Sequence, residues 1–504
     1  MKLADIRKGI EDGLLVPVRS LRLRYVPLLT VYFAQGASGL SSIAENFWVK
    51  ERLSLSAEAL IALGVWLTIP WTAKMVIGQF VDCVAIFGSR RRVYVFIGAA
   101  LMAAASLILS GTAGGWLTLA PAEVQYIVAS FLAVIGLVVQ DVVADTMSTE
   151  VVNRTDGDGN PLPEAVINQE LGMIQVLGRL SLALGAFCVA GLGGWLANIF
   201  DYETVFLIAI GVPAMSVLGA LLVRLDNVEP GRLDVRIMGG GVLFAVATVA
   251  LGLSDIPYSQ EIVFIVSMIV VVALLRLTID ELPKETQRQI LLAAVIIFVF
   301  RAMPGVGPGN QWWQIDVLGF DPAFFGVLAQ LGAGLSIAGT WVLGGFLTRT
   351  PLTTILLGLT IVSTVMTLPN IALYYGIHHW TEVHFGFGAR TIAILDSTLE
   401  SPFSQLSMIP LLTLIAIHAP PGRRATWFAL MASLMNLALN AGGLATKYLN
   451  KVFLIERGVY ADLGMLLITV TVAGFVLPAA TILLLGPRLK LNESRSKFTA
   501  GQVC

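Results

Sequence analysis

Charge is scarce in this sequence. Only 13% of its 504 residues are charged, whereas soluble domains carry about a quarter. Lys and Arg (32) nearly balance Asp and Glu (33), so no net charge points to nucleic acid or to an acidic partner. A chain that is 56% hydrophobic, with a mean hydropathy of +0.82, is too apolar for a soluble domain. We therefore interpret it as a membrane protein that crosses the lipid bilayer many times.

Residues that carry redox, metal or hydrolytic chemistry are also few. The three cysteines are too scattered for a disulfide framework or a thiolate metal site, and the four histidines lack ligand spacing. No glycine-rich loop follows a strand pattern to hold nucleotide phosphates, and no serine or cysteine has a paired base. We therefore expect no enzymatic activity, no cofactor, no metal and no direct use of ATP.

The N-terminal residues 1–24 alternate basic and apolar side chains. They contain no short apolar core followed by a small-residue cleavage site, so we do not interpret them as a removed signal peptide. We expect a cytoplasmic amphipathic segment whose arginines lie at the inner end of the first membrane span.

Long apolar runs are what the sequence has in abundance. A helix needs about 20 apolar residues to cross about 30 Å of hydrocarbon. Backbone groups in lipid must find partners within the chain, so continuous runs of this length predict helices rather than barrel strands. We predict about 14 spanning helices from windows of this length. Their ranges are 25–48, 57–79, 93–111, 122–147, 168–198, 203–224, 236–254, 259–278, 290–310, 322–347, 351–376, 388–417, 422–450 and 460–486.

Basic residues fall in every second loop between these windows. If the N-terminus is cytoplasmic, the inner loops contain Arg90 to Arg92, Arg224, Lys284 and Arg423, while outer loops contain mainly acidic residues. The stretches around Lys50 and Lys447 are exceptions. The pattern predicts that both termini are cytoplasmic, and the compact loops suggest the inner, or plasma, membrane of a bacterium.

Two stretches of the chain share one layout. FWVKERLSLSAEALIALG (47–64) and WWQIDVLGFDPAFFGVLAQLG (312–332) each have an aromatic pair, a short polar link and then a new helix. We predict two six-helix halves related as parallel repeats, with two helices inserted between them; chance similarity of apolar runs is the alternative. The predicted regions are the N-terminal segment 1–24, the first half 25–224, the insertion 225–289, the second half 290–486 and the tail 487–504.

The stretch GQFVDCVAIFGSRRR (78–92) places charge between two apolar runs. Its Gly-x-x-x-Asp followed by arginines resembles the signature loop of the major facilitator superfamily. In that case Gly78 would let a neighbouring helix approach closely, and Asp82 would pair with an arginine to hold an inner gate. The alternative is that Arg90 and Arg91 only anchor the loop in the cytoplasm.

The wider sequence closely resembles the folate-biopterin transporter family. The resemblance rests on IPWTAKMVIGQFVDCVAIFGSRRRVYVFIG (69–98), VYFAQGASGL (31–40), QDVVADTMSTEVV (140–152), VLGFDPAFFGVL (317–328) and LDSTLESPFSQLSMIPLLTLIAIHAPPGRRATWFALMASLMN (395–436). It implies an all-helical transporter of the major facilitator fold for folate-like or pterin-like molecules. Two departures are Arg424, where members usually have an acidic residue, and RAMPGVGPGNQWWQID (301–316), where they usually have a polar and aromatic run.

Ionisable residues within the spans supply candidates for proton coupling. Each costs about 2.5–3.5 kcal/mol at the bilayer centre, so it needs a partner or a role. Asp141 and Asp145, and likewise Asp396 and Glu400, are spaced four residues apart and share a helix face. Like charges held together favour uptake of a proton, as coupling requires. For Asp145, a solvated carboxylate at the inner end is the alternative.

Fixed positive charge supplies candidates for substrate binding. Arg179 and Arg301 would hold a carboxylated substrate or stack on a flat ring, unless they pair with carboxylates of the chain. Pro304 and several glycines follow Arg301, so we expect its helix to break there and to expose backbone groups to a cavity. Trp312 would form an aromatic platform or, alternatively, an anchor at the membrane interface.

These observations together predict a secondary transporter that works by alternating access, with a small folate-like or pterin-like substrate, a coupling proton, and no nucleic-acid partner. The alternatives are a transporter of another amphipathic anion or nucleoside-like metabolite, or a non-transporting assembly factor or receptor. The predicted substrate-binding residues are Gln35, Glu45, Arg179, Arg301, Trp312 and Asp396. The predicted gating residues are Lys74, Gly78, Asp82, Arg90 and Arg91.

Overall fold

The structure is a computed structural model of the chain. It describes residues 21–488 except 73, 90, 154, 156–159, 161, 223–238, 240–242, 244–245, 248–249, 252–253, 255, 281–282, 350–351 and 407–423. In these residues the backbone forms helices joined by turns, and strand pairing is limited to two isolated bridges, Ile86 with Ser89 and Glu456 with Val459. The predicted all-helical class is confirmed for the described chain.

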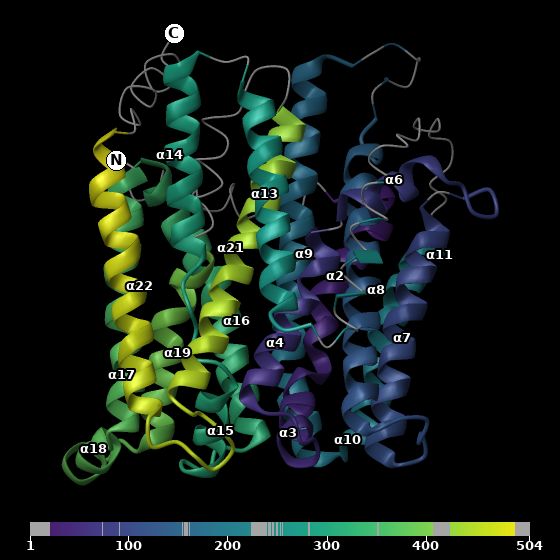
Figure 1. Cartoon of the computed structure of the whole chain (residues 1–504). Helices are drawn as coiled ribbons and strands as arrows, with labels where there is room; N and C mark the ends of the chain where they lie inside the picture. Colours follow the sequence, from purple (N-terminus) through teal and green to yellow (C-terminus); the bar gives the residue numbers. More distant parts are fainter. Residues whose placement is uncertain are drawn as a thin grey trace, which may run out of the picture. The chain divides into compact units, whose positions relative to one another are not determined.

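The chain divides into two compact units, and neither is continuous in sequence (Figure 1). The first unit consists of residues Met1–Leu53, Ala73–Ala245 and Phe325–Gln330. Its described helices are η1 (Leu23–Tyr25), α2 (Val26–Ala37), η2 (Ser38–Ser41), α3 (Ser42–Arg52), α6 (Lys74–Cys83), α7 (Arg92–Gly114), α8 (Ala122–Glu150), α9 (Glu164–Ile199), α10 (Tyr202–Ala209) and α11 (Gly211–Leu222).

The second unit consists of residues Ser54–Thr72, Val246–Phe324 and Leu331–Cys504. Its described helices are α4 (Ala57–Leu67), α5 (Ile69–Thr72), α13 (Ser259–Ile279), α14 (Lys284–Arg301), α15 (Pro308–Asp316), α17 (Leu352–Tyr374), α18 (Ile377–Phe385), α19 (Ala389–Leu406), α21 (Arg424–Val452), α22 (Leu463–Leu485) and η3 (Gly486–Arg488). Helix α16 (Pro322–Arg349) contributes residues to both units.

Six of the described helical segments are long and apolar enough to cross a membrane, by length and composition: Arg92–Gly114, Ala122–Ser148, Leu177–Ile199, Tyr202–Leu221, Thr353–Tyr374 and Leu463–Arg488. Shorter apolar helical segments are Ala57–Trp71, Ser259–Ala273 and Pro322–Ala338. The chain is therefore a multi-pass membrane protein. The total of about 14 spans and the cytoplasmic placement of the termini stay predictions.

Helix α2 packs directly on α9 in the first unit. A Cβ added at Gly36 would overlap the Leu182 carbonyl oxygen, and one at Gly185 would overlap the Phe33 carbonyl oxygen. Small residues thus bring the two backbones into contact, as is common where helices pack in a membrane. Ala34 and Ala37 of α2 are fully buried beside this contact. The result is a rigid pair of helices that carries part of the candidate site.

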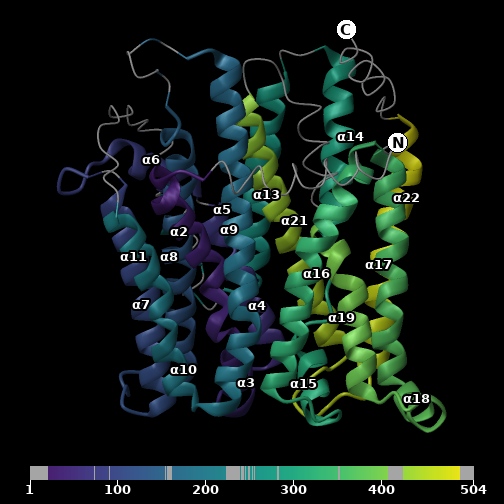
Figure 2. The same ribbon diagram turned by 180° about the vertical axis from the view of Figure 1, so that it is seen from behind.

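Helices α14, α21 and α22 share the main apolar core of the second unit. Ile290 and Ile297 of α14 are fully buried, and they pack with Met431 of α21 and Ile482 of α22. Both ribbon views show α14, α17 and α22 side by side (Figures 1 and 2). Phe300 packs against this core and also lines a cavity described below.

Candidate functional site

Three helices of the first unit bring charged side chains together. Lys74 begins α6, while Asp141 and Asp145 lie one turn apart on α8. The Lys74 Nζ lies 2.5 Å from Oδ2 of Asp141 and 2.5 Å from Oδ2 of Asp145. Arg179 of α9 is close enough to act electrostatically on Asp141. One ammonium group therefore holds two carboxylates, with a guanidinium nearby.

Tyr32 of α2 completes this charged cluster. Its hydroxyl donates a hydrogen bond of 3.1 Å to Oδ1 of Asp145. Its ring is fixed by α9, because a Cβ at Gly178 would lie 2.7 Å from the ring. The two carboxylates differ in their access to solvent: the Asp141 side chain is 18% exposed and that of Asp145 is 52% exposed. A proton would thus reach Asp145 more easily than Asp141.

The arrangement can exchange one ion pair for another. Protonation of either carboxylate would remove one of the two negative charges that share Lys74 and leave the ammonium with the other. The sequence placed Lys74, the aspartates and Arg179 in three separate roles, and the structure brings all of them together. Their contact was not foreseen because the helices that meet are far apart in the chain. Tyr32 was missed as well, although it stands in a motif block.

Glu45 and Gln35 lie elsewhere in the first unit. Glu45 of α3 accepts a hydrogen bond from the Tyr126 hydroxyl of α8, and Tyr126 packs edge-on against Trp48. Gln35 is 8% exposed on α2, and its Nε2 finds no hydrogen-bond partner among the described residues. Neither residue contacts the charged cluster in the contacts that the structure describes.

In the second unit the helix breaks where the sequence predicts it. Helix α14 ends at Arg301, and α15 begins at Pro308. Helix α21 holds the broken segment: Thr446 accepts a 2.8 Å hydrogen bond from the Gly305 N–H, and the Asn450 Nδ2 donates one of 2.9 Å to the Val306 carbonyl. Arg301 is half-buried.

A cavity of about 310 Å³ lies beside this break. Met303, Pro304 and Val306 from the break line it together with faces of α17 and α22. The predicted helix break and a cavity beside it are therefore present, whereas the Gly305 N–H and the Val306 carbonyl of the break are bonded to α21. Asp396 lies half-buried on α19. Glu400 is on the same helix, but its side chain lies outside the described residues.

Trp312 and its neighbour Trp313 are enclosed by the second unit. They are 3% and 4% exposed. The Arg457 guanidinium lies 5.0 Å from the Trp312 ring centre, and the Trp313 ring lies 5.4 Å from that of Tyr374. The interpretation of these rings as membrane-interface anchors is wrong, because an anchor must reach the lipid headgroups.

The charged loop between α6 and α7 caps helix ends. The Arg91 Nη1 donates a 2.6 Å hydrogen bond to the Val81 carbonyl, and the Tyr94 hydroxyl lies 3.0 Å from the carbonyl oxygens of Phe80 and Val84. The last carbonyls of a helix lack partners within it, so these side chains satisfy the end of α6. Arg92 does the same for the Ala220 carbonyl near the end of α11.

Gly78 is not needed for a close helix approach. A Cβ added there would lie 3.9 Å from the nearest atom, Cγ1 of Val142, which is an ordinary contact. That part of the sequence interpretation is wrong. The Asp82 side chain and Arg90 lie outside the described residues, so their predicted part in a gate stays a prediction.

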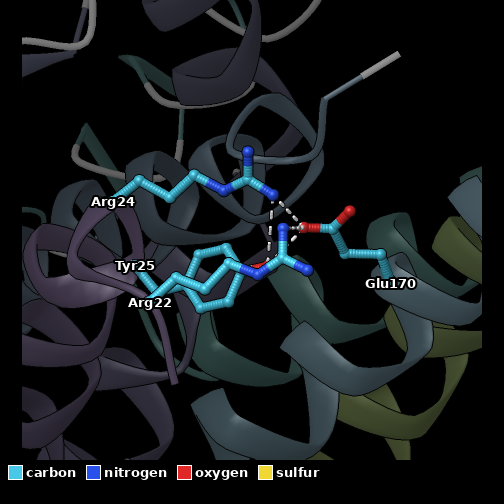
Figure 3. A network of polar contacts seen from close by, with 4 residues as sticks. All are labelled: Arg22, Arg24, Tyr25 and Glu170. Atoms are coloured by element: carbon cyan, nitrogen blue, oxygen red, sulfur yellow. Dashed lines mark hydrogen bonds and ion pairs between the residues drawn. The ribbon is translucent and has the colours of Figure 1, made fainter. Parts of the chain in front are cut away.

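A second polar network joins the N-terminal residues to α9 (Figure 3). Oε1 of Glu170 accepts hydrogen bonds from the Arg24 guanidinium and from the Tyr25 hydroxyl, and Arg22 Nη1 lies 3.4 Å from the same oxygen. The Glu170 side chain is only 14% exposed. This network ties the segment before α2 to the early turns of α9.

Comparison with known proteins places this geometry in context. Residues 35–500 match the model of the BT1 family. The "Folate-biopterin transporter" of Synechocystis sp. is 27% identical over 84% of this chain and 74% of its own length. The "Probable folate-biopterin transporter 4" of Arabidopsis thaliana is 24% identical over 86% of this chain and 90% of its own length.

Solved structures show the same fold. A mutant of the peptide transporter POT, in complex with sulfate, matches with a TM-score of 0.64 at 17% identity and covers 92% of this chain and 94% of that one. A POT family transporter in complex with 5-aminolevulinic acid matches with a TM-score of 0.62 at 15% identity, over 92% of this chain and 96% of that one. The described helices therefore follow the major facilitator fold.

Proposed function

The chain belongs to the BT1 family, and on that premise we propose that it carries folate-like or pterin-like molecules across the membrane and couples their movement to protons. The family and the named relatives are transporters and not enzymes. The substrate class is supported by the relatives' names, and the coupling rests on the chain's own residues.

The charged cluster is the observation that supports coupling. Lys74 is shared by Asp141 and Asp145 at 2.5 Å from each. Protonation of Asp145, the more exposed carboxylate, would weaken its ion pair with Lys74 and the hydrogen bond that it accepts from the Tyr32 hydroxyl. Because Lys74 belongs to α6, a change of its partner would shift that helix relative to α8 and α2. Proton binding would thereby bias the conformational equilibrium of the transporter.

Substrate binding would use fixed positive charge. Arg179 on α9 and Arg301 at the end of α14 would attract the carboxylate of a folate-like molecule, with Gln35, Glu45, Trp312 and Asp396 as further proposed contacts. Asp396 and Glu400 are a second proposed coupling pair. Cytoplasmic termini and an inner-membrane location complete the proposal.

The test is uptake into proteoliposomes that contain the purified chain. Labelled folate and labelled biopterin would be offered with and without an inward proton gradient. We expect uptake that the gradient accelerates. In an Asp145→Asn variant we expect exchange of labelled for unlabelled substrate to continue, while gradient-driven accumulation is lost, because only accumulation needs the proton that Asp145 would bind.

A matched control is Asp316→Asn, which removes a carboxylate that accepts a 2.5 Å hydrogen bond from Tyr460 and lies outside the charged cluster. It should accumulate substrate as the wild type does. Correctly folded wild-type protein that moves neither compound would overturn the substrate class. Equal accumulation with and without the gradient would overturn the coupling.

A further inference from the structure

The cavity beside the helix break is lined by uncharged polar groups. Its described lining comes from α14 and the break that follows it, from α17 and from α22, all within the second unit. Among these residues there is no Asp, Glu, Lys, Arg or His. Threonine, serine and asparagine side chains line it alongside apolar ones, including Phe300 and Met303. A charged ligand would therefore lose its hydration without gaining a counter-charge.

The hydroxyl groups of this cavity are arranged to accept hydrogen bonds. Thr360 donates its proton to the Leu356 carbonyl at 2.8 Å, and Thr471 donates to the Leu467 carbonyl at 2.8 Å. Each hydroxyl has one proton, so the lone pairs of its oxygen are what remains for a ligand. Thr367 and Thr471 face each other with their oxygens 3.3 Å apart, one from α17 and one from α22.

A proline in α22 adds a backbone acceptor to the same wall. Pro478 lies inside the helix and has no N–H, so the Gly474 carbonyl, four residues earlier, does not receive the usual helical hydrogen bond. Gly474 and Pro478 both line the cavity. Asn370 of α17 also lines it, and its amide can both donate and accept.

We propose that this cavity binds the uncharged ring of the cargo: a flat heterocycle with amino and ring N–H donors, of which a pterin is the test case. The volume of about 310 Å³ is at the lower end of the range for small-molecule pockets. Acceptor oxygens would meet the ring's N–H groups, and the Asn370 amide would meet its lactam edge. Apolar side chains such as Phe300 would cover the ring faces. This inference rests on the proposed function and adds where, and through which chemistry, the ring is held.

Gly474 allows the cavity to be filled without disturbing its surroundings. A Cβ built there meets no atom of the described chain within 4 Å, and the same is true at Gly358 of α17, which is not among the cavity's described lining. Gly474→Leu should therefore occupy the cavity, while Gly358→Leu makes the same change on α17 at a position that is not among the cavity's described lining. Binding of biopterin to the detergent-purified full chain would be measured through the fluorescence of the pterin.

We expect Gly474→Leu to weaken biopterin binding more than about tenfold, and Gly358→Leu to leave it within about twofold of the wild type. Equal affinities in the two variants would overturn the proposal. A second variant covers the case in which Gly474→Leu fails to fold. Thr471→Val removes one acceptor, and its control is Thr469→Val, an exposed threonine of the same helix that donates to the Met465 carbonyl at 2.8 Å.

A modified ligand tests the chemistry of the contact. A pterin whose exocyclic amino group carries two methyl groups has lost those N–H donors. If Thr471 accepts from that group, the wild type should bind the methylated ring more weakly, and Thr471→Val should lose no further affinity for it. If methylation of the ligand and Thr471→Val each weaken binding and their effects add, Thr471 does not accept a hydrogen bond from the exocyclic amino group.

Different experimental results would overturn the cavity proposal and the proposed function. Gradient-driven uptake of biopterin by the wild type, combined with unchanged binding and uptake in Gly474→Leu, would overturn the cavity proposal and leave the function standing. Wild-type protein that binds no biopterin would overturn the cavity proposal, whatever happens to folate uptake. Loss of binding in Gly474→Leu, with wild-type binding in Gly358→Leu and Thr469→Val, would support a ring site in this cavity.

Discussion

Each unit contains a polar feature, and the two features differ in chemistry. The first gathers ionised groups: Lys74 between Asp141 and Asp145, with Arg179 nearby. The second surrounds a cavity with neutral hydroxyls, and the described residues that line it carry no charge. In a low-dielectric interior, a charge that lacks a partner is costly, whereas a hydroxyl can bond to its own helix and still accept from a ligand. The comparison teaches that charge is concentrated where a proton could act and is absent where a neutral ring could bind.

The glycines of the two units differ from position to position in how closely neighbouring atoms approach them. Helices α2 and α9 of the first unit touch backbone to backbone at Gly36 and Gly185. In the second unit, the space around Gly358 and Gly474 is open within 4 Å among the described atoms. Glycine allows close contact between α2 and α9, as it does at Gly442 of the second unit, and it leaves room at Gly358 and Gly474. Four predictions test these differences, in order of decreasing effect.

Gly185→Val should have the largest effect on stability. Its side chain would overlap the Phe33 carbonyl, and overpacking of this kind costs about 3 kcal/mol or more when backbone must move. We expect little monodisperse protein and a marked fall in apparent Tm. Gly358→Val carries the same β-branched change into open space of the second unit and should fold normally. Equal Tm values would contradict the difference in packing.

Lys74→Met should abolish gradient-driven uptake and should also lower the Tm. Removing one partner of a partly buried ion pair costs about 3 kcal/mol, which corresponds to roughly a hundredfold change in an equilibrium. The control is Lys447→Met, which breaks the 3.2 Å pair between Lys447 and Glu261 in the second unit. This variant should lower Tm and retain uptake. Similar uptake by both variants would show that the charged cluster has no special role.

Tyr94→Phe and Tyr374→Phe should each destabilise the protein by about 1 kcal/mol, the net contribution of a typical hydrogen bond. Tyr94 bonds carbonyls at the end of α6. Tyr374, in the second unit, lies 2.7 Å from the Tyr460 carbonyl oxygen and 2.9 Å from that of Ala461. Similar falls in Tm for Tyr94→Phe and Tyr374→Phe would show that tyrosine hydrogen bonds to loop carbonyls stabilise the two units to the same extent. A Tyr94→Phe protein as stable as wild type would argue against the capping role.

The smallest effect should come from Asp321, which caps α16. Burial opposes its ionisation, but the Phe324 N–H at 2.8 Å and Arg390 at 2.6 Å outweigh burial and hold the pKa of Asp321 below its ordinary value. A lowered folded-state pKa stabilises the protein above the unfolded pKa near 3.9, and this contribution is lost as the pH falls through the folded value.

The Asp321–Arg390 pair is largely exposed, at 41% and 55% of the two side chains, so its contribution should stay below about 1 kcal/mol. Asp321→Asn should lower Tm slightly at pH 6, and the difference from wild type should disappear toward pH 3. A Tm difference between wild type and Asp321→Asn that grows as the pH falls would contradict a lowered pKa of Asp321.

Local signals in the sequence were sufficient for the all-helical class and for several local features, whereas the major facilitator fold was implied by the family resemblance. Pro304 and its neighbouring glycines predicted the end of α14 and the cavity beside it, because proline and glycine act on the backbone directly. The four-residue spacing of Asp141 and Asp145 predicted a shared helix face. These conclusions needed only neighbouring residues.

Tertiary contacts account for what the sequence did not predict. Lys74 and Asp141 are in contact because α6 packs on α8. The sequence of neither helix indicates which helix it packs against. The sequence suggested that Trp312 is an interface anchor because it lies near a helix end. Hydropathy cannot tell whether such a ring faces lipid or another part of the protein, here Arg457. Gly78 fits a familiar motif, yet the space around it accepts a Cβ. In each case the missing information was the identity of the neighbouring helix.

The discontinuous second unit has a consequence for how the protein is made. Helix α4 packs on α21, where the Thr68 hydroxyl bonds to Asn440 and Lys451 lies 3.6 Å from Glu58. A ribosome adding 5–20 residues per second completes α4 about 20–70 s before it reaches α21. During that time α4 lacks α21, on which it packs, so the surface that α21 will cover must be sheltered by lipid, by the insertion machinery or by a chaperone.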